Sequence, residues 1–331
     1  MTEQSTAAMP FRRLGSSGVK VSVLSFGSWV TFNDQLDVGR AAECMAAARE
    51  FGVNFFDNAE VYAGGESERV MGQAIQRLGW KRHEYLVTSK YYWGIIEGPN
   101  TRRTLNRKYL LEAIPASLER FGLEHLDVIY AHRPDPNTPI AETVRAFSDA
   151  IDRGWAHYWG TSEWSAEEIR TAIALAERHH LHAPITEQPQ YHLLHRTRLE
   201  VEYRRLIEDT GYGTTTWSPL AGGLLTGKYL DGVPKGSRAQ LSRSFEERLT
   251  SGVHNDAIRA LAAVADELDV SLAQLAIGWC ALNPSVSTVI TGASRPEQVV
   301  ENMGALAVLE RADAAVRQRI HDIVGGPTQW W

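Results

Sequence analysis

The chain of 331 residues is expected to fold as one (β/α)8 barrel of the α/β class, a TIM barrel, with an N-terminal β-hairpin and extra C-terminal helices. Short apolar runs alternate with amphipathic segments along almost the whole chain, which is typical of parallel strands covered by helices. Eight such strand-helix units follow one another without a break in composition. The rival architecture is a doubly wound open sheet, which usually carries G-x-G-x-x-G after its first strand. The sequence reads FGSWVTFNDQ at that point, so the barrel is favoured.

The N-terminal part predicts a hairpin, which precedes the first strand of the barrel. Phe11 to Val23 has short alternating runs around Ser17-Gly18, and such a hairpin could cap one end of the barrel. The runs expected to form the eight barrel strands are SVLSFGSW, VNFFDN, YLVTSK, LDVIYAH, AHYWGTS, PITEQPQY, GYGTTTWSPL and SVSTVITGAS.

Helices are expected between these strands because apolar residues recur there at helical spacing. Gly79 and Gly122 are stop signals, Pro139 opens a helix, and Ser165 with Glu168 forms a capping box. The expected helices cover 37–51, 67–78, 106–121, 139–153, 165–180, 200–209, 256–268, 271–282, 296–306 and 312–324. A long polar stretch over 222–255 interrupts the pattern and is interpreted as a lid or a binding loop.

Composition limits the partners and the compartment. The net charge of -6 and the pI near 6.0 give no basic field of the kind that attracts nucleic acid or an anionic membrane, so neither is expected as a partner. No apolar run of about 18 residues predicts a membrane span, and residues 1–10 lack the apolar core of a signal peptide. Cys44 and Cys280 lie inside helix-like segments, which indicates packed thiols in a reducing compartment. We therefore expect a cytoplasmic protein with disordered residues 1–10 and a single domain over residues 11–331.

Four ionisable residues lie at or just after the ends of three successive strands. Asp57 ends an apolar run, Tyr62 follows it in a Gly-rich turn, Lys90 ends YLVTSK, and His132 ends LDVIYAH. A polar side chain in such a place needs a partner or water. Neighbouring strands of a parallel barrel lie about 5 Å apart and present their C-terminal ends at one rim. The four side chains are therefore expected to meet at one mouth.

This combination predicts a site that protonates an oxyanion. Free tyrosine titrates near pH ~10, and a nearby ammonium stabilises its ionised form. Lys90 is the available cation for Tyr62, and Asp57 can keep the lysine charged. His132 can hydrogen-bond a substrate carbonyl oxygen. A Schiff-base aldolase is an alternative for Lys90 taken alone, although Asp57 argues against it by keeping the amine protonated.

A proton donor alone reduces nothing, so a cofactor that supplies hydride is required. The stretch WSPLAGGLLTGK offers an aromatic face, close backbone approach at two glycines and one lysine charge. The stretch TGASRPEQVVEN opens a helix, and a helix N-terminus binds anions readily. The residues that carry these features are Trp217, Gly222, Gly223, Lys228, Gly292, Ser294 and Arg295, with Ser162 and Gln188 as partners for a carboxamide.

Over residues 11–324 the sequence resembles the aldo-keto reductases. RPDPNTPI, YWGTSEWS, TWSPLAGGLLTGKY and TGASRPEQVVEN are most similar to the subgroup that holds the voltage-gated potassium channel beta subunits and their bacterial relatives. The resemblance assigns the catalytic tetrad of the family to Asp57, Tyr62, Lys90 and His132. Channel beta subunits carry Asn at the position of His132, so the chain follows the broader reductase pattern there.

The same resemblance implies that NADP(H) is the cofactor, with NADH left open. The implied contacts run from Ser162 and Gln188 to the nicotinamide amide, from Trp217 to the ring, from Ser218, Leu220, Gly222 and Lys228 to the pyrophosphate under Arg238, from Ser294, Arg295 and Gln298 to the 2′-phosphate, and from Glu301 and Asn302 to adenine. Trp29, Pro219 and Gly292 complete the expected cofactor surface. Glu163 stands where the beta subunits have an arginine, beside the position of the nicotinamide amide.

The expected function is the NADPH-dependent reduction of a small aldehyde or ketone, with Tyr62 as the proton donor. The alternative is a redox-sensing subunit that holds NADP(H) tightly and turns over slowly. The resemblance also implies a homo-oligomer, either a tetramer or an octamer.

Several aromatic and histidine residues have less specific interpretations. The substrate pocket or ordinary rim packing is expected to hold Trp29, Tyr91, Trp93 and Trp164. No metal site is expected, because the histidines lack a recognised ligand spacing. Surface and loop positions are expected for His179, His180, His182, His192 and His195. The terminal pair Trp330-Trp331 could dock at a subunit contact, cover the substrate mouth, or pack on the barrel or fray.

Overall fold

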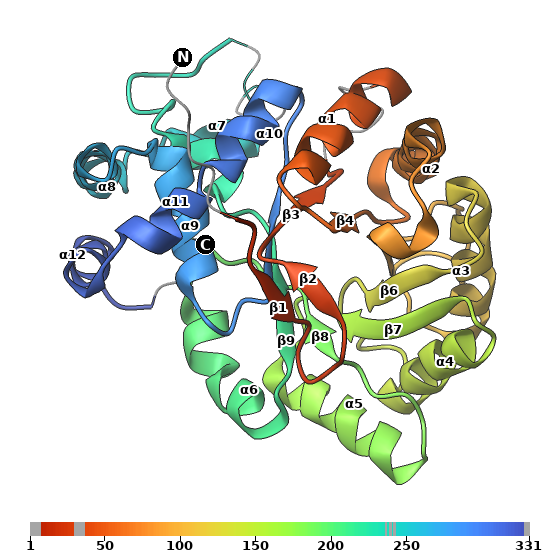
Figure 1. The fold of residues 1–331 in the computed structure, drawn as a ribbon. Helices are drawn as coiled ribbons and strands as arrows, with labels where there is room; N and C mark the ends of the chain where they lie inside the picture. The colour runs from red at the N-terminus through yellow and green to blue at the C-terminus, as the bar shows by residue number, and fades with distance from the viewer. Residues whose placement is uncertain (1–7, 30–36, 236, 238–239, 241–242, 328–331) are drawn as a thin grey trace.

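The computed structural model describes residues 8–29, 37–235, 237, 240 and 243–327. Eight strands close into a barrel in the order β10-β3-β4-β5-β6-β7-β8-β9, and helices surround it (Figure 1). The barrel strands are all parallel and are β3 (Leu24–Gly27), β4 (Phe55–Asp57), β5 (Leu86–Tyr91), β6 (Leu126–Ala131), β7 (Ala156–Thr161), β8 (Thr186–Glu187), β9 (Gly213–Thr216) and β10 (Thr288–Thr291). The expected fold class is confirmed. The expected disorder over residues 1–10 falls mostly on residues 1–7, which lie outside the described residues.

The predicted hairpin is present and closes the N-terminal end of the barrel. Strands β1 (Phe11–Arg13) and β2 (Lys20–Ser22) pair antiparallel and lie across the barrel in Figure 1. Leu14 and Val21 are fully buried against Phe55, Val128 and Tyr130, which come from β4 and β6. Because apolar side chains fill this end, a site for small molecules must open at the other end.

Local signals explain where the helices begin and end. Asn106 caps α3 by accepting a hydrogen bond from the backbone N–H of Tyr109 at 2.8 Å. Gly79 and Gly122 end α2 and α3 in the left-handed conformation, with φ of 64° and 66°. The helices are α1 (Val38–Glu50), α2 (Glu66–Leu78), α3 (Arg107–Phe121), α4 (Ile140–Asp152), α5 (Ala166–Arg178), α6 (Arg204–Thr210), α7 (Arg243–Leu249), α8 (Asn255–Glu267), α9 (Leu272–Leu282), α10 (Pro296–Met303), α11 (Leu306–Arg311) and α12 (Ala314–Val324).

Four elements differ from the sequence prediction, one of them the separate short helix α11 (Leu306–Arg311) between the two predicted C-terminal helices. The sixth strand is only two residues long because Pro184 and Pro189, which flank it, have no N–H to donate to a neighbouring strand. The helix expected over 200–209 begins as a π-helical turn, Arg198–Glu202, before α6. The polar stretch after β9 contains a 3-10 segment, Ala221–Thr226, and the short helix α7, so it is not a uniform loop.

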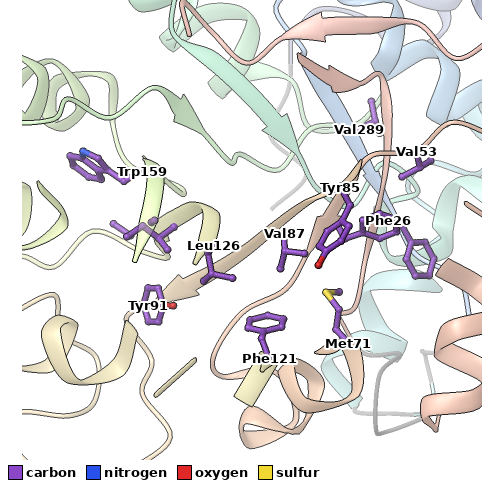
Figure 2. Close-up of a cluster of buried hydrophobic side chains, with 14 of the residues drawn as sticks. Phe26, Val53, Met71, Tyr85, Val87, Tyr91, Phe121, Leu126, Trp159 and Val289 are labelled. Atoms are coloured by element: carbon purple, nitrogen blue, oxygen red, sulfur yellow. The ribbon is translucent and has the colours of Figure 1, made fainter. Parts of the chain in front are cut away.

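The main apolar core lies between the outer face of the barrel and the helices. Figure 2 shows strand residues such as Phe26, Val87 and Val289 in the same cluster as Met71 and Phe121 from α2 and α3. Full burial of such a side chain stabilises the fold by about 1.5 to 3 kcal/mol. Since strand side chains alternate between faces, this outward packing turns the intervening residues toward the barrel axis.

Two expectations about the chain as a whole can be compared with the fold. Cys44 and Cys280 are buried free thiols, as predicted. Over the described ranges, no helix combines the length and the apolar character that crossing a membrane requires.

Candidate active site

The four ionisable residues meet at the C-terminal end of the barrel. Asp57 ends β4, Lys90 lies on β5, and His132 directly follows β6. Lys90 Nζ donates to Asp57 Oδ2 at 2.7 Å, to the carbonyl oxygen of Asn58 at 2.7 Å and to Tyr62 Oη at 3.2 Å. The side chains of Lys90 and Asp57 are 0% and 5% exposed, so the ion pair is shielded from water.

A tight turn places Tyr62 over the lysine. Tyr62 opens the 3-10 segment that connects β4 to α2, and the next three residues all have positive φ. Gly65 has a φ of 95°, and a Cβ there would lie 3.0 Å from the side chain of Arg120, so glycine is required. Lys90 Nζ lies 4.8 Å from the centroid of the Tyr62 ring.

Burial and charge set the protonation of this pair. Burial by itself would lower the pKa of Lys90, but Asp57 and Tyr62 outweigh it, and the pKa lies above its ordinary value. Burial raises the pKa of Tyr62, and Lys90 only partly opposes that rise. Only the lowering by Lys90 was expected from the sequence, because the burial of the phenol is not visible there. At neutral pH the site therefore holds an ammonium and a protonated phenol.

His132 is neutral beside the phenol. Burial lowers its pKa well below the ordinary value, and Lys90 and Arg133 lower it further. Its ring centroid lies 6.0 Å from that of Tyr62 and 6.3 Å from that of Trp93. Its Nδ1 is buried without a hydrogen-bond partner among the described residues. A neutral imidazole can hydrogen-bond an oxygen that is bound next to the phenol of Tyr62.

A cavity of about 970 Å³ opens at this end of the barrel. Asp57, Tyr62 and His132 line it, whereas Lys90 is not among the described residues that do. Lys90 therefore reaches a bound molecule through Tyr62. The cavity is also lined by the cofactor candidates Trp29, Ser162, Gln188, Trp217, Ser218, Pro219, Leu220, Gly222, Lys228, Gly292, Ser294, Arg295, Gln298, Glu301 and Asn302. Arg238 lies outside the described residues.

The loop after β9 provides a backbone cradle in the cavity wall. Ser218 adopts a φ of 60°, and its Oγ accepts a hydrogen bond from the N–H of Gly222 at 3.3 Å. Gly223 has a φ of 105°, and a Cβ there would lie 3.2 Å from Lys228 Nζ. A compact, side-chain-free backbone beside an ammonium suits a pyrophosphate, so these residues fit a dinucleotide.

The loop after β10 forms the far end of the cavity. Ser294 donates from its N–H and its Oγ to Gln298 Oε1, at 2.9 and 3.0 Å. Arg295 is exposed and lies 4.0 Å from the carboxylate of Glu297. Asn302 Nδ2 donates to the carbonyl oxygen of Gly292 at 3.2 Å. The basic side chain and the start of α10 therefore lie together, an arrangement that favours an anionic group.

Gln188 and Ser162 already form hydrogen bonds with residues of the site. Gln188 Nε2 donates to Asp57 Oδ1 at 3.0 Å, and Ser162 Oγ donates to the carbonyl oxygen of Gln188 at 2.8 Å. Thr88 Oγ1 also donates to Asp57 Oδ1, at 2.8 Å. The amide of Gln188 therefore helps to hold the Asp57 carboxylate, a contact that sequence reasoning missed.

Two further features of the mouth were not expected from the sequence. Glu163 accepts hydrogen bonds from Trp217 Nε1 at 3.1 Å and from the N–H of Gln190 at 2.6 Å, so it positions the indole. Three cavity-lining arginines, Arg102, Arg103 and Arg133, were also missed. Arg102 and Arg103 lie in an irregular loop and Arg133 follows His132 by one residue, so no periodicity signalled them.

The histidines required one correction. His192 and His195 are buried at 0% and 8% exposure, not at the surface, because Leu193 and Leu194 of the same loop pack into an apolar cluster with α8 and α9. The described residues contain a group that could hold a metal ion, formed by His125, Asp127 and His157 at the opposite end of the barrel. Strand pairing of β6 with β7 brings these residues together across about thirty positions of sequence, a separation that ligand-spacing rules do not cover.

Comparisons with known proteins agree with this geometry. A family model described as the aldo/keto reductase family matches residues 23–323. A probable voltage-gated potassium channel subunit beta of Arabidopsis thaliana is 49% identical over 320 residues, which cover 96% of this chain and 97% of that protein. A protein of the same description from Oryza sativa subsp. japonica is also 49% identical, with the same coverage. A putative voltage-gated potassium channel subunit beta of Schizosaccharomyces pombe is 45% identical over 324 residues, or 96% of this chain and 93% of that protein.

Proposed function

Because this chain belongs to the aldo/keto reductase family and is therefore an oxidoreductase, we propose that it reduces aldehydes or ketones to alcohols with NADPH. One observation carries the proposal. Tyr62 Oη lies 3.2 Å from a buried ammonium, and the phenol lines the same cavity as a neutral imidazole and the dinucleotide cradle.

The proposed reaction needs a hydride and a proton on the two atoms of a carbonyl. A reduced nicotinamide, when bound, supplies the hydride to the carbonyl carbon. Tyr62 donates its phenolic proton to the carbonyl oxygen. His132 hydrogen-bonds that oxygen and orients it toward the phenol.

Lys90 and Asp57 act behind the proton donor. The ammonium stabilises the phenolate that remains after Tyr62 has given its proton, because the two groups lie in a buried, weakly screened site. Asp57 keeps the lysine charged and aimed, with Thr88 and Gln188 holding the carboxylate. The acid is thus assembled from residues of β4 and β5 and of the segments that directly follow β4 and β8.

The basic residues of the cofactor half favour NADPH. Lys228 lies beside the glycine cradle and Arg295 at the start of α10, so two positive charges are spaced along the cavity wall for phosphate groups. A 2′-phosphate would meet Arg295, and NADH would lack that interaction. We therefore expect NADPH to bind more tightly than NADH.

A substrate screen tests the function directly. Consumption of NADPH at the nicotinamide absorbance would be followed with a panel of aromatic and aliphatic aldehydes and ketones, in parallel with NADH. We expect turnover with several aldehydes, and a lower KM for NADPH than for NADH. A complete lack of turnover by a folded protein that binds NADPH would contradict the proposal.

A second candidate function is a redox-sensing subunit that holds NADP(H) and turns over slowly. It is favoured by the descriptions of the relatives, which are potassium channel beta subunits at 45% to 49% identity. A single turnover of prebound NADPH with aldehyde separates the two functions. Fast oxidation followed by slow cofactor release favours the sensor, whereas fast release favours the enzyme. The homo-oligomer, a tetramer or octamer, belongs to the same proposal and is measured by light scattering.

A further inference from the structure

The charges that line the cavity are mostly positive. The positively charged lining residues are Arg102, Arg103, Arg133, Lys228 and Arg295, and the carboxylates are Asp57 and Glu301. Asp57 is already paired with Lys90, at 2.7 Å. The described part of the cavity therefore presents an excess of positive charge to whatever it binds.

The positive charges form two groups on opposite sides of the mouth. Lys228 follows β9 and Arg295 follows β10, whereas the three arginines follow β5 and β6. In the closed ring of strands, β5 is four places from β9 and β6 is four places from β10, which is as far apart as eight strands allow. A dinucleotide on the cradle uses Lys228 and Arg295. The arginine group is left for the second ligand, the substrate.

Arg103 is held in place with its charge unused. It is an exposed residue in the left-handed conformation, with a φ of 52°, which is unfavourable for a residue with a Cβ. The loop around it is tied down by hydrogen bonds from Thr104 N–H to the Tyr92 carbonyl at 3.0 Å and from Leu105 N–H to Asp135 Oδ2 at 2.8 Å. Its guanidinium makes no hydrogen bond or ion pair with any described residue. Arg102, by contrast, pairs with Glu97.

Arg133 brings a second charge close to the reacting groups. Its Nη1 donates to Ser162 Oγ at 3.2 Å, and its guanidinium carbon lies 6.0 Å from the centroid of the Trp93 ring. After burial and Lys90, its charge also contributes to the lowered pKa of His132. Arg133 therefore places a positive charge close to the imidazole of His132.

Apolar side chains line the same cavity as the two charges and the phenol. These residues are Trp29, Val61, Ala63 and Trp93, and Trp29 is 40% exposed. Aromatic walls of this kind bind a flat or alkyl body by burying its surface. A ligand on this side therefore meets an apolar wall and, beyond it, a cation.

We propose that the preferred substrates are aldehydes or ketones with an aromatic or alkyl body that also carry an anionic group, such as a carboxylate. Arg103 binds the anionic group at the rim, and the positive charge of Arg133 attracts the same group. This inference rests on the proposed reductase function and specifies its substrate class.

Matched substrates test the charge directly. 4-Carboxybenzaldehyde and its methyl ester have the same ring and differ in charge. The ester withdraws more electron density and so makes its aldehyde the more reactive of the two, which means that a preference for the carboxylate cannot come from intrinsic reactivity. We expect kcat/KM with NADPH to be at least about tenfold higher for the carboxylate at low ionic strength, with the preference shrinking as salt screens the arginines.

Variants separate Arg103 from general electrostatics. Arg103→Met is expected to reduce the ratio of carboxylate to ester to about threefold or less, and Arg103→Lys to restore part of it. Arg145→Met is the matched control, because this exposed arginine lies on α4 and not among the cavity residues, and the ratio should stay unchanged.

The outcomes distinguish two failures. A ratio near one in the wild-type protein, or a full ratio retained in Arg103→Met, overturns the inference while turnover of the ester leaves the reductase function standing. If neither the carboxylate nor the ester nor any other aldehyde is reduced, the proposed function itself fails, and this inference fails with it.

Discussion

The two ends of the barrel each hold an ion pair that joins neighbouring segments. At the mouth, Lys90 on β5 binds Asp57 on β4 with Nζ and Oδ2 2.7 Å apart. At the end capped by the hairpin, Arg82, in the 3-10 turn Arg82–Glu84 before β5, binds Asp127 on β6 with Nη2 and Oδ2 2.6 Å apart. Asp57 lines the cavity of about 970 Å³, and Asp127 is not among the described residues that line it. The same kind of contact therefore stands in two different environments.

The difference lies in the third partner of each pair. Lys90 Nζ also donates to Tyr62 Oη, a group that faces the cavity and can exchange a proton with a ligand. Arg82 donates instead to the backbone carbonyls of Tyr85 and His125, and Asp127 accepts from the N–H of Val87 at 2.8 Å. The pair of Arg82 and Asp127 is completed by hydrogen bonds to backbone groups and joins neighbouring segments, whereas the pair of Lys90 and Asp57 lies beside a phenol and a cavity and can support proton transfer.

The largest expected effect comes from removing the phenol at the mouth. Tyr62→Phe should reduce the rate of the reduction step by on the order of 10³-fold, because a positioned general acid contributes about 10² to 10⁴. NADPH affinity should stay close to that of the wild-type protein. Single-turnover kinetics and a binding titration measure the two quantities.

Tyr85→Phe is the matched control for that variant. Tyr85 is a buried tyrosine directly before β5, near the capped end, so loss of its hydroxyl should leave the rate intact. Equal rates in the two variants would remove the proposed distinction between the ends.

Replacing the ammonium should have the next largest effect. Lys90→Met should slow reduction by on the order of 10²-fold, since a lost charge stabiliser in a buried site costs about that much. Lys90 lowers the pKa of Tyr62 against the effect of burial, so its removal raises that pKa further. The loss of reductase activity at alkaline pH, where the phenol ionises, should therefore move to higher pH.

Rates from neutral to strongly alkaline pH, with melting curves alongside, measure this shift. The melting curves matter because the variant leaves Asp57 buried without its cation, which destabilises the fold. An unchanged alkaline limb in a folded variant would show that Lys90 does not act on Tyr62.

The matching change at the capped end should affect stability and not rate. Asp127→Asn removes the charge that Arg82 binds, where the two side chains are 9% and 26% exposed. We expect the free energy of unfolding to fall by about 2 kcal/mol. Urea unfolding and kcat, measured on one preparation, give the two quantities. A large loss of kcat with unchanged stability would contradict the structural role of this ion pair.

The smallest expected effect concerns the two histidines that flank β6. The buried His132 keeps a pKa well below its ordinary value when folded, so below pH ~6.5 the unfolded chain binds a proton that the folded chain does not. Its contribution to stability is present above pH ~6.5 and is lost as the pH falls. The free energy of unfolding of the wild-type protein should therefore fall between pH 7 and 5. In His132→Gln this fall should be smaller, by up to about 2 kcal/mol.

His125→Gln at the capped end is the comparison. Burial, Arg82 and His157 also lower the pKa of His125, but water reaches this ring, so its pH effect should be smaller. The free energies of unfolding of both variants, measured at several pH values, test this difference. An equal pH effect in the two variants would mean that the burial of His132 does not make it differ from His125.

Much of this protein can be predicted from local sequence. Gly79, Gly122 and the capping pair Ser165 and Glu168 predicted helix ends correctly, because caps and stops depend on a few neighbouring residues. The convergence of the groups at the mouth was predictable for a related reason. Once the strands are assigned to a parallel barrel, their C-terminal ends must share one rim.

Other features depend on contacts between distant segments. The π-helical start before α6 and the two-residue β8 escaped a prediction based on periodicity. The contact from Gln188 to Asp57 joins residues separated by 131 positions, and no pattern in the sequence signals it. The arginines of the rim were also missed, because an irregular loop carries no period.

The sequence by itself determined that the carboxylate, phenol, ammonium and imidazole reach one mouth, and the tertiary structure decided their protonation and which further charges surround them. Burial raises the pKa of Tyr62 despite Lys90 and lowers that of His132, and burial depends on everything packed around a residue. Desolvation depends on the assembled fold and not on the residues adjacent in sequence. For the same reason, only the fold shows that the pair of Arg82 and Asp127 meets backbone, while the pair of Lys90 and Asp57 meets a proton donor at a cavity.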